Sequence, residues 1–327
     1  MLRIVLNEND GGQRLDKFLS KTVRDLPMSL MYKYIRTKRI KVNGKKAKQD
    51  MKLCGGDVIE MYIPEEFTSK KEKSKGELFS AVREKPDIVY EDENIIICDK
   101  RPGLLSHTGD NTENNSAELS EKDTLIFLIQ AYLYNKGEYS PEEEASFAPA
   151  LCNRIDRNTG GLVIAAKNAM ALREINRLIR EGGVKKQYLC AVHGKPVPAA
   201  ATLRGHLFKN SKTKTVTVYN EARRGSKEII THYKTLSYNK SLSLSLLEVT
   251  LGTGRTHQIR AHMASIGNPL LGEGKYGENK NDKKLGYKHQ ALYSYKVSFT
   301  AEDGELQYLD KKTFEADRKN IKFLELF

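Results

Sequence analysis

The sequence contains few cysteines, and their spacing does not suit a metal site. The four of them are widely separated and form no Cys-x-x-Cys pair (Cys54, Cys98, Cys152 and Cys190). Structural zinc sites use closely spaced ligands, so the sequence argues against one. Isolated cysteines are typical of reduced thiols in a cytosolic protein.

Long apolar segments and common ligand motifs are missing too. No apolar run approaches the roughly 20 residues that span a bilayer, and Met1 is not followed by an apolar signal region. We therefore expect a cytoplasmic protein without membrane contact. The GTGR segment at 252–255 lacks the spacing and the Gly-Lys-Ser/Thr ending of a phosphate-binding P-loop. His257 and His262 are five positions apart rather than the four that would align metal ligands on a helix face.

Positive charge is abundant and unevenly distributed. The 327 residues include 55 Lys and Arg against 42 Asp and Glu, which gives a net charge of +13. Residues 1–64 carry 14 basic against 7 acidic side chains, residues 107–147 carry 2 against 9, and residues 148–327 carry 31 against 16. This pattern predicts a polyanionic partner that contacts both ends of the chain and avoids the acidic segment.

The first 64 residues predict a small α+β module. Apolar residues recur at helical spacing over 14–24, and Pro27 followed by Ser29 predicts the start of a second helix over 30–36. Asn43-Gly44 is typical of a tight hairpin turn, and residues 57–63 form an expected closing strand.

The remainder of the chain predicts a larger α+β domain. Residues 65–85 are polar and predict a linker, so we expect domains at 1–64 and 86–327, with an acidic insertion at about 110–147. A strand pair is expected over 88–99. Short β-branched segments follow residue 150, with helices expected at 123–134, 169–180 and 256–266. The regular βαβ alternation of a doubly wound fold is absent.

One carboxylate stands out in the segment LCNRIDRNTGGLVIAAKN, residues 151–168. Asp156 lies between Arg154 and Arg157, and a nearby cation would stabilise its negative charge. Gly160-Gly161 predicts a tight turn that presents Asp156 at the edge of the sheet. Taken alone, the pattern favours a surface salt bridge at a turn over a catalytic residue.

Further motifs favour a catalytic site. They are IIICDKRPGLLSH at 95–107, KKQYLCAVHG at 185–194 and GTGRTHQIRAHM at 252–263, followed by GNPLLGEGKYG. Within the second motif we expect Tyr188 to open a strand. Together with NRIDRNTGG they resemble, in the same order, the RluA-type pseudouridine synthase family over about residues 88–300. The chain differs from that family at Asn153, where His is common, at Gly160, where Ser is common, and at Arg101, which separates Lys100 from Pro102.

The resemblance implies an activity and a site. It implies a mixed, largely antiparallel sheet with a central cleft, and isomerisation of uridines in structured RNA without a metal or organic cofactor. Asp156 matches the catalytic aspartate, Tyr188 the tyrosine that stacks on the base, and Arg260 the arginine that pairs with the aspartate. The resemblance also gives cleft-shaping or RNA-contacting positions to Arg154, Arg255, His257 and Gln258.

The N-terminal module resembles the S4 RNA-binding domain in QRLDKFLSK, KYIRTKRI and KVNGKKA. Residues 33–48 hold eight Lys or Arg and no acid, a density that favours an anionic ligand over an ordinary solvated face. The basic residues expected to contact RNA are Lys33, Arg36, Lys38, Arg39, Lys41, Lys45 and Lys46.

The target of the enzyme has more than one interpretation. We expect a monomer that acts on large-subunit ribosomal RNA. Within the family, the alternative is a synthase that acts on tRNA. If the protein is not an enzyme, the alternative is a non-catalytic, RNA-binding ribosome-assembly factor with the same fold. A magnesium-dependent nuclease would need clustered acids around Asp156, and the sequence has none there.

Overall fold

The computed structural model describes residues 1–67, 75–108, 121–210, 213 and 215–327. Contacts divide the chain into two compact units. Unit 1 comprises residues 1–85, 128–150 and 166–172, and unit 2 comprises residues 86–127, 151–165 and 173–327. The domain boundaries predicted from the sequence therefore stay predictions, since unit 1 also takes in two later segments.

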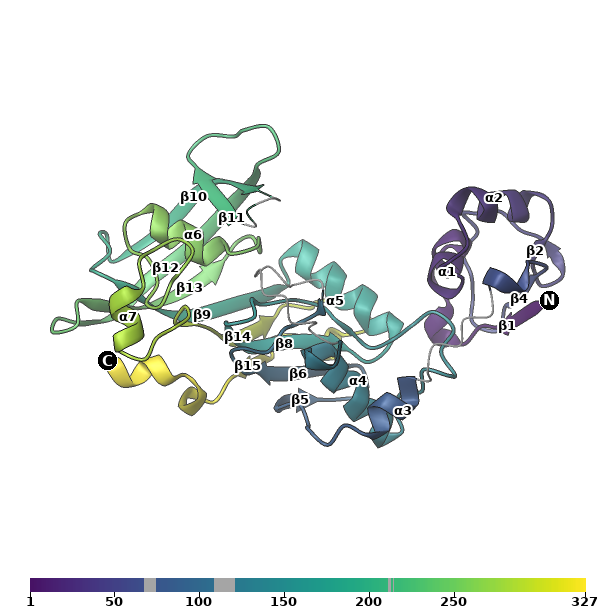
Figure 1. Cartoon of the computed structure of the whole chain (residues 1–327), viewed down its shortest axis with the longest axis horizontal. Coiled ribbons are helices and arrows are strands. Elements are labelled where there is room, and N and C mark those ends of the chain that lie inside the picture. Colours follow the sequence, from purple (N-terminus) through teal and green to yellow (C-terminus); the bar gives the residue numbers. More distant parts are fainter. Residues whose placement is uncertain (68–74, 109–120, 211–212, 214) are drawn as a thin grey trace. The chain divides into compact units, whose positions relative to one another are not determined.

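Unit 1 contains a four-stranded antiparallel sheet with two helices (Figure 1). The sheet order is β1-β4-β2-β3 (Leu2–Val5, Val58–Met61, Ile40–Val42 and Lys45–Lys46), and the helices are α1 (Leu15–Thr22) and α2 (Met28–Arg36). The predicted helices, hairpin and closing strand are confirmed, and β1 is an additional strand. Ser29 is not the helix cap, because α2 already begins at Met28, directly after Pro27.

The turn of the β2–β3 hairpin follows the sequence prediction. Asn43 and Gly44 have φ angles of +51° and +70°, as a tight turn between antiparallel strands requires. Leu15 and Phe18 of α1 and Ile40 of β2 are fully buried in one apolar cluster of the unit. Burial of such side chains provides most of the stability of a module this small.

Part of the predicted linker is structured. Lys75–Ser80 form helix α3, and the Phe79 ring is buried with its centroid 5.8 Å from that of Tyr134 and 6.2 Å from that of Tyr139. A single large apolar side chain therefore anchors a segment whose composition is otherwise polar. Residues 68–74 lie outside the described residues.

Of the acidic segment that we expected to be an insertion, residues 110–120 lie outside the described residues, and residues 128–147 belong to unit 1. Helix α4 (Leu125–Lys136) follows the predicted range, and most of its side chains are buried. Farther along, the Asp10 carboxylate accepts hydrogen bonds from the Ser146 amide and hydroxyl at 2.9 and 2.6 Å, and Glu144 accepts one from Asn9 at 2.7 Å. Removing residues 1–64 would leave these groups without partners, so a clean excision of the S4-like module is not expected.

Unit 2 is built on an eleven-stranded mixed sheet (Figure 1). Its main order is β11-β10-β12-β13-β9-β14-β8-β6-β5, with β15 beside β14 and β7 beside β8. The strands are β5 (Ile88–Glu91), β6 (Ile95–Lys100), β7 (Ala150–Leu151), β8 (Gly160–Ala166), β9 (Val184–His193), β10 (Ala200–Asn210), β11 (Thr215–Tyr219), β12 (Lys227–Asn239), β13 (Leu244–Leu251), β14 (Leu292–Phe299) and β15 (Thr313–Glu315). β14 pairs with β8 in parallel and with β9 and β15 antiparallel, which confirms the mixed, largely antiparallel sheet.

The α-helices that follow β8 are α5 (Ala169–Glu181), α6 (Gln258–Ser265) and α7 (Lys280–Lys284), and short 3-10 helices lie at Gln307–Leu309, Arg318–Asn320 and Lys322–Leu326. α6 lies against β11 and β12. None of the described helices is both long enough and apolar enough to cross a membrane.

Two local predictions about the sheet are wrong in detail. Gly160 and Gly161 are the first residues of β8 rather than a turn, and a Cβ on Gly161 would overlap the backbone of Ser294 on β14. Glycine is needed there for the close approach of two strands, not for reversal of the chain. Tyr188 does not open its strand but lies in the middle of β9, opposite Val249 and Ser294.

Candidate active site

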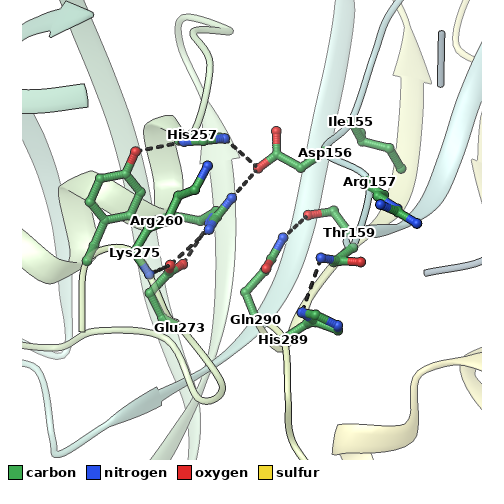
Figure 2. Close-up of polar contacts among 12 residues, drawn as sticks. Ile155, Asp156, Arg157, Thr159, His257, Arg260, Glu273, Lys275, His289 and Gln290 are labelled. Atoms are coloured by element: carbon green, nitrogen blue, oxygen red, sulfur yellow. Dashed lines mark hydrogen bonds and ion pairs between the residues drawn. The ribbon is translucent and has the colours of Figure 1, made fainter. Parts of the chain in front are cut away.

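The loop that carries Asp156 is fixed by partners from other segments. The Ile155 carbonyl accepts a hydrogen bond from the Ser106 hydroxyl at 2.9 Å, and the Thr159 hydroxyl accepts one from the Gln290 amide at 3.2 Å. Asn158 contacts His289 at 3.2 Å. Figure 2 shows the Asp156 side chain pointing away from these anchors toward His257 and Arg260. The loop therefore presents one carboxylate from a fixed backbone.

Lys100, at the end of β6, is a buried anchor of the same loop. Its Nζ donates to the carbonyl oxygens of Arg101, Leu104 and Arg157 at 3.1, 2.8 and 2.9 Å. Burial lowers the pKa of Lys100 to about 7, although the Asp156 charge opposes the shift. Through these three hydrogen bonds Lys100 joins the loop of the DKRPG motif to the loop of Asp156. The sequence motif did not reveal this role of Lys100.

The centre of the site is a carboxylate–guanidinium–carboxylate chain (Figure 2). Arg260 Nη1 donates to Asp156 Oδ2 at 2.9 Å, while Nε and Nη2 donate to the two oxygens of Glu273 at 2.6 and 2.8 Å. The Arg260 and Glu273 side chains are 7% and 0% exposed, whereas Asp156 is 26% exposed. Glu273 therefore fixes the guanidinium from within, and Asp156 is the member of the chain that solvent or a substrate reaches.

The charge states of Arg260 and Glu273 follow from the bidentate contact between them. Burial lowers the pKa of Arg260, but its hydrogen bonds to Glu273 and the charges of Asp156 and Glu273 raise it by more, so the net shift is upward. Burial raises the pKa of Glu273, and the hydrogen bond with Arg260 reverses that effect, giving a net decrease. Both groups are therefore charged at neutral pH, and the guanidinium is a permanent cation beside Asp156.

His257 and Gln258 lie at the start of α6, and neither presents a free polar group to solvent. Gln258 is 2% exposed; its side chain accepts from Thr253 Oγ1 at 2.8 Å and donates to Ile230 O at 2.9 Å. These contacts brace the 252–255 loop, which suits the cleft-shaping alternative for Gln258; an RNA contact stays a prediction. His257 is 5% exposed, with Nε2 3.8 Å from Asp156 Oδ2 and Nδ1 2.7 Å from the Tyr276 hydroxyl.

Tyr188 lies on the sheet near the same carboxylate. Burial raises the pKa of Tyr188 to about 12, with a hydrogen bond to Ser294 opposing the shift and the Asp156 charge adding to it. Its side chain is largely buried, with 6% of the residue exposed. The phenol is therefore protonated at neutral pH and lies within electrostatic range of Asp156.

The sequence-predicted residues fall into two groups. The structure brings Asp156, Arg260 and His257 together, with Tyr188 near them. Arg154 and Arg255 are exposed on the loops that flank the site, and neither takes part in the carboxylate chain. Glu273 and Tyr276 were not identified as site residues from the sequence, although both lie in the recognised motif GEGKYG. That motif was the one sequence feature that could have pointed to them, but its spacing does not connect it to Asp156.

The arrangement suits general-base or nucleophilic chemistry. A carboxylate with one oxygen held by a cation and the other uncovered can attack an electrophilic carbon or remove a proton. Within the described residues, no group of three or more His, Cys, Asp or Glu side chains could hold a metal ion.

A second candidate surface lies on the S4-like module. Six of the seven predicted RNA-binding residues are exposed, on α2, the following turn and the hairpin, and Lys41 is half-buried. Arg39 lies over the ring of Tyr34 and Lys41 over that of Tyr62, each 5.4 Å from the centroid. None of the ion pairs found in the described part of the chain involves any of the seven.

Comparison with known proteins identifies the class. The family model described as RNA pseudouridylate synthase matches residues 94–265, and the S4 domain model matches residues 13–59. An uncharacterized RNA pseudouridine synthase of Mycoplasma capricolum is 30% identical, with 95% of this chain and 96% of that protein aligned. Ribosomal large subunit pseudouridine synthase C of Buchnera aphidicola is also 30% identical, over 90% of this chain and 88% of that protein.

Solved structures share the fold. Human RNA Pseudouridylate Synthase Domain Containing 4 superimposes with a TM-score of 0.54 at 20% identity, over 77% of this chain and 95% of that one. The RNA pseudouridylate synthase match over residues 94–265 and the S4 match over residues 13–59 together indicate an RNA-binding enzyme. The chain belongs to the RNA pseudouridine synthase family, whose members are isomerases.

Proposed function

We propose that this protein converts specific uridines of large-subunit ribosomal RNA to pseudouridine, with Asp156 as the catalytic residue. The observation that carries the proposal is the Asp156 carboxylate, held through Oδ2 by a buried guanidinium and still partly exposed. A non-catalytic assembly factor would have no need for a buried Arg260–Glu273 pair behind an accessible carboxylate. We expect the protein to act as a monomer.

The reaction needs no external reactant. The N1–C1′ bond of uridine breaks, the uracil turns, and C5 bonds to C1′; C5 loses one proton and N1 gains one. A base inside a helix must first be flipped out. Asp156 then acts as a nucleophile at C1′ or as the base that removes a sugar proton, and Arg260 stabilises its charge and orientation. Tyr188 supplies a flat surface against the uracil.

The proposed target rests on similarity and charge. Several relatives are named ribosomal large subunit pseudouridine synthase C, from Buchnera and Vibrio among others. The S4 domain carries the acid-free basic segment at 33–48, which suits a folded, phosphate-rich RNA. A tRNA target is the alternative within the same family.

The test compares substrates directly. Purified protein is incubated with large-subunit ribosomal RNA and with bulk tRNA, each transcribed without modifications, and pseudouridine is mapped by carbodiimide labelling and primer extension. We expect discrete sites in the ribosomal RNA. Sites in tRNA alone would overturn the target and keep the activity, whereas no pseudouridine in either RNA, from protein that binds both, would favour the assembly factor.

Tyr188 offers a prediction that separates stacking from chemistry. Tyr188→Phe should keep the affinity for RNA and lower the rate, because the ring remains and the hydroxyl near Asp156 is lost. Tyr188→Leu should also weaken binding of the target nucleotide by roughly 1–3 kcal/mol, the usual value of base stacking. Filter binding and single-turnover rates measure the two effects. Equal affinities of the two variants would show that Tyr188 does not stack on the base.

The basic segment predicts a salt-dependent contribution to binding. Replacing Lys33, Arg36 and Lys45 by Gln should weaken binding and reduce the slope of log K against log salt by about 0.7–0.9 for each phosphate that is no longer neutralised. The side chains are exposed, so the fold should be unaffected. Charge variants are preferred to truncation because Asp10 holds Ser146.

A matched control removes three exposed lysines elsewhere. Lys311, Lys319 and Lys322 are exposed near the C-terminal end, and their replacement by Gln changes the net charge equally. The control should leave the salt slope close to that of the unaltered protein. If both triple variants change the slope by the same amount, only overall charge matters and the S4 segment is not a specific RNA contact.

A further inference from the structure

The motif GEGKYG places Tyr276 beside the candidate active site, and neither Tyr276 nor His257 has a part in the mechanism described so far. We infer that Tyr276 and His257 form a second arm that positions the Asp156 carboxylate, in addition to the arm formed by Glu273 and Arg260. The inference rests on the proposed function, in which Asp156 carries out the chemistry.

His257 is held in an unusual conformation. It has a φ angle of +55°, in the left-handed region, and occupies the N-cap position of α6. A residue other than glycine is uncommon there, and such strain persists where surrounding contacts enforce it. The imidazole is 3% exposed and lies between the Tyr276 hydroxyl and the Asp156 carboxylate. Figure 2 marks its contact with Asp156 by a dashed line. The backbone therefore directs the ring into the site.

The hydroxyl of Tyr276 determines which ring nitrogen carries the proton. It accepts a hydrogen bond from the Val216 amide at 3.2 Å and lies 2.7 Å from His257 Nδ1. A hydroxyl has one proton, and the amide of Val216 cannot accept it, so the proton is directed at Nδ1. Burial raises the pKa of Tyr276 to about 12, so the phenol is protonated at neutral pH.

The opposite nitrogen then faces the carboxylate as a donor. Burial lowers the pKa of His257 to about 4 despite the Asp156 charge, so the ring is neutral at pH 7. With Nδ1 accepting, the single ring proton lies on Nε2, which is 3.8 Å from Asp156 Oδ2. The other tautomer would direct a nitrogen lone pair at the carboxylate, which is electrostatically unfavourable.

Both arms converge on the same oxygen. Arg260 Nη1 is 2.9 Å from Oδ2, and the His257 N–H approaches that oxygen from a second direction. The separation of 3.8 Å between His257 Nε2 and Oδ2 is longer than a hydrogen bond, as is common for catalytic contacts that shorten when substrate binds. With Oδ2 bonded to Arg260 and faced by the His257 N–H, Oδ1 is left to engage the ribose. His257 is thus a positioning residue, and its buried ring is not a contact for RNA.

The test uses three variants, His257→Leu, His257→Gln and Tyr276→Phe, in the full-length protein. Single-turnover rates are measured on the RNA that the unaltered protein modifies, with RNA affinity and thermal unfolding followed in parallel. His257→Leu should lower the rate by about 10- to 100-fold, the range of a lost hydrogen bond to a charged group, with affinity unchanged. His257→Gln should retain activity to within about fivefold, because its amide can place an N–H near Oδ2.

Tyr276→Phe completes a double-mutant cycle. It should lower the rate by about 3- to 10-fold, and in the His257→Leu background it should have no further effect, since the hydroxyl acts through the ring. The positioning role would be overturned by additive losses in the double variant, or by a His257→Gln variant that is as slow as His257→Leu. It would also be overturned if the rate losses only follow reduced affinity or reduced thermal stability. If unaltered protein forms no pseudouridine, or Asp156→Asn is fully active, the proposed function itself fails, independently of this cycle.

Discussion

Replacing Asp156 by Asn should reduce the rate of pseudouridine formation by about 10³-fold or more, because the side chain keeps its shape but loses its charge and basicity. Affinity for RNA and the free energy of unfolding should change little. The loop remains fixed through Ile155, Asn158 and Thr159, and the Asn oxygen can still accept from Arg260. Carbodiimide mapping after single-turnover incubation measures the loss.

Arg157→Gln is a useful control for this experiment. Arg157 is the next residue on the same loop and donates through Nε to the Gly103 carbonyl at 3.0 Å, away from the carboxylate chain. The Arg157→Gln variant should keep most of the activity. A variant at Asp156 that still converts uridine at a substantial fraction of the normal rate would contradict its assignment as the catalytic residue.

Replacing Arg260 should reduce both stability and activity. Arg260→Met leaves the Glu273 carboxylate buried without its cation, which typically costs about 3–5 kcal/mol of folding free energy. Arg260→Lys retains the charge but cannot contact Asp156 and both oxygens of Glu273 together, so we expect a smaller loss of stability and a rate lower by about 10²-fold. Denaturant unfolding and single-turnover assays measure both quantities.

A double variant separates the two effects. In Arg260→Met with Glu273→Gln, no buried charge is left uncompensated, and the Gln oxygen can still accept from the Lys275 amide as Glu273 does at 2.8 Å. Much of the stability should return, whereas activity should not, because Asp156 has lost its guanidinium partner. Recovery of activity along with stability would mean that Arg260 serves the fold alone.

Much of the local structure was predictable because it depends on neighbours in the sequence. The Asn43-Gly44 turn requires positive φ angles that these residues tolerate, and the helices α1, α4 and α5 follow apolar spacing. Some strands of unit 2, such as β8, β11 and β13, were recognisable as short apolar or β-branched segments. Less was predictable where one distant contact overrides composition, as with Phe79, which anchors a helix in a segment that is otherwise polar.

The candidate site shows the same division. Motif order pointed to Asp156, Tyr188 and Arg260, and the structure brings the first and third into contact across 104 positions of the chain. The function of glycine at Gly161, by contrast, was misjudged, because its need arises from Ser294 on a neighbouring strand. For Gln258 the sequence left cleft-shaping and RNA contact open, because a polar side chain in a motif gives no sign of whether it is buried.

The sequence alone determined the family, the order of the elements and the residue types of the site, since these follow from local patterns and recognisable motifs. Only the tertiary structure decided which polar groups meet: that Glu273 holds Arg260, that Lys100 fixes the Asp156 loop, and that Tyr276 faces His257. The physical reason is that hydrogen bonds and ion pairs act over about 3–4 Å. The packing of distant strands sets those distances, and spacing along the chain does not encode them.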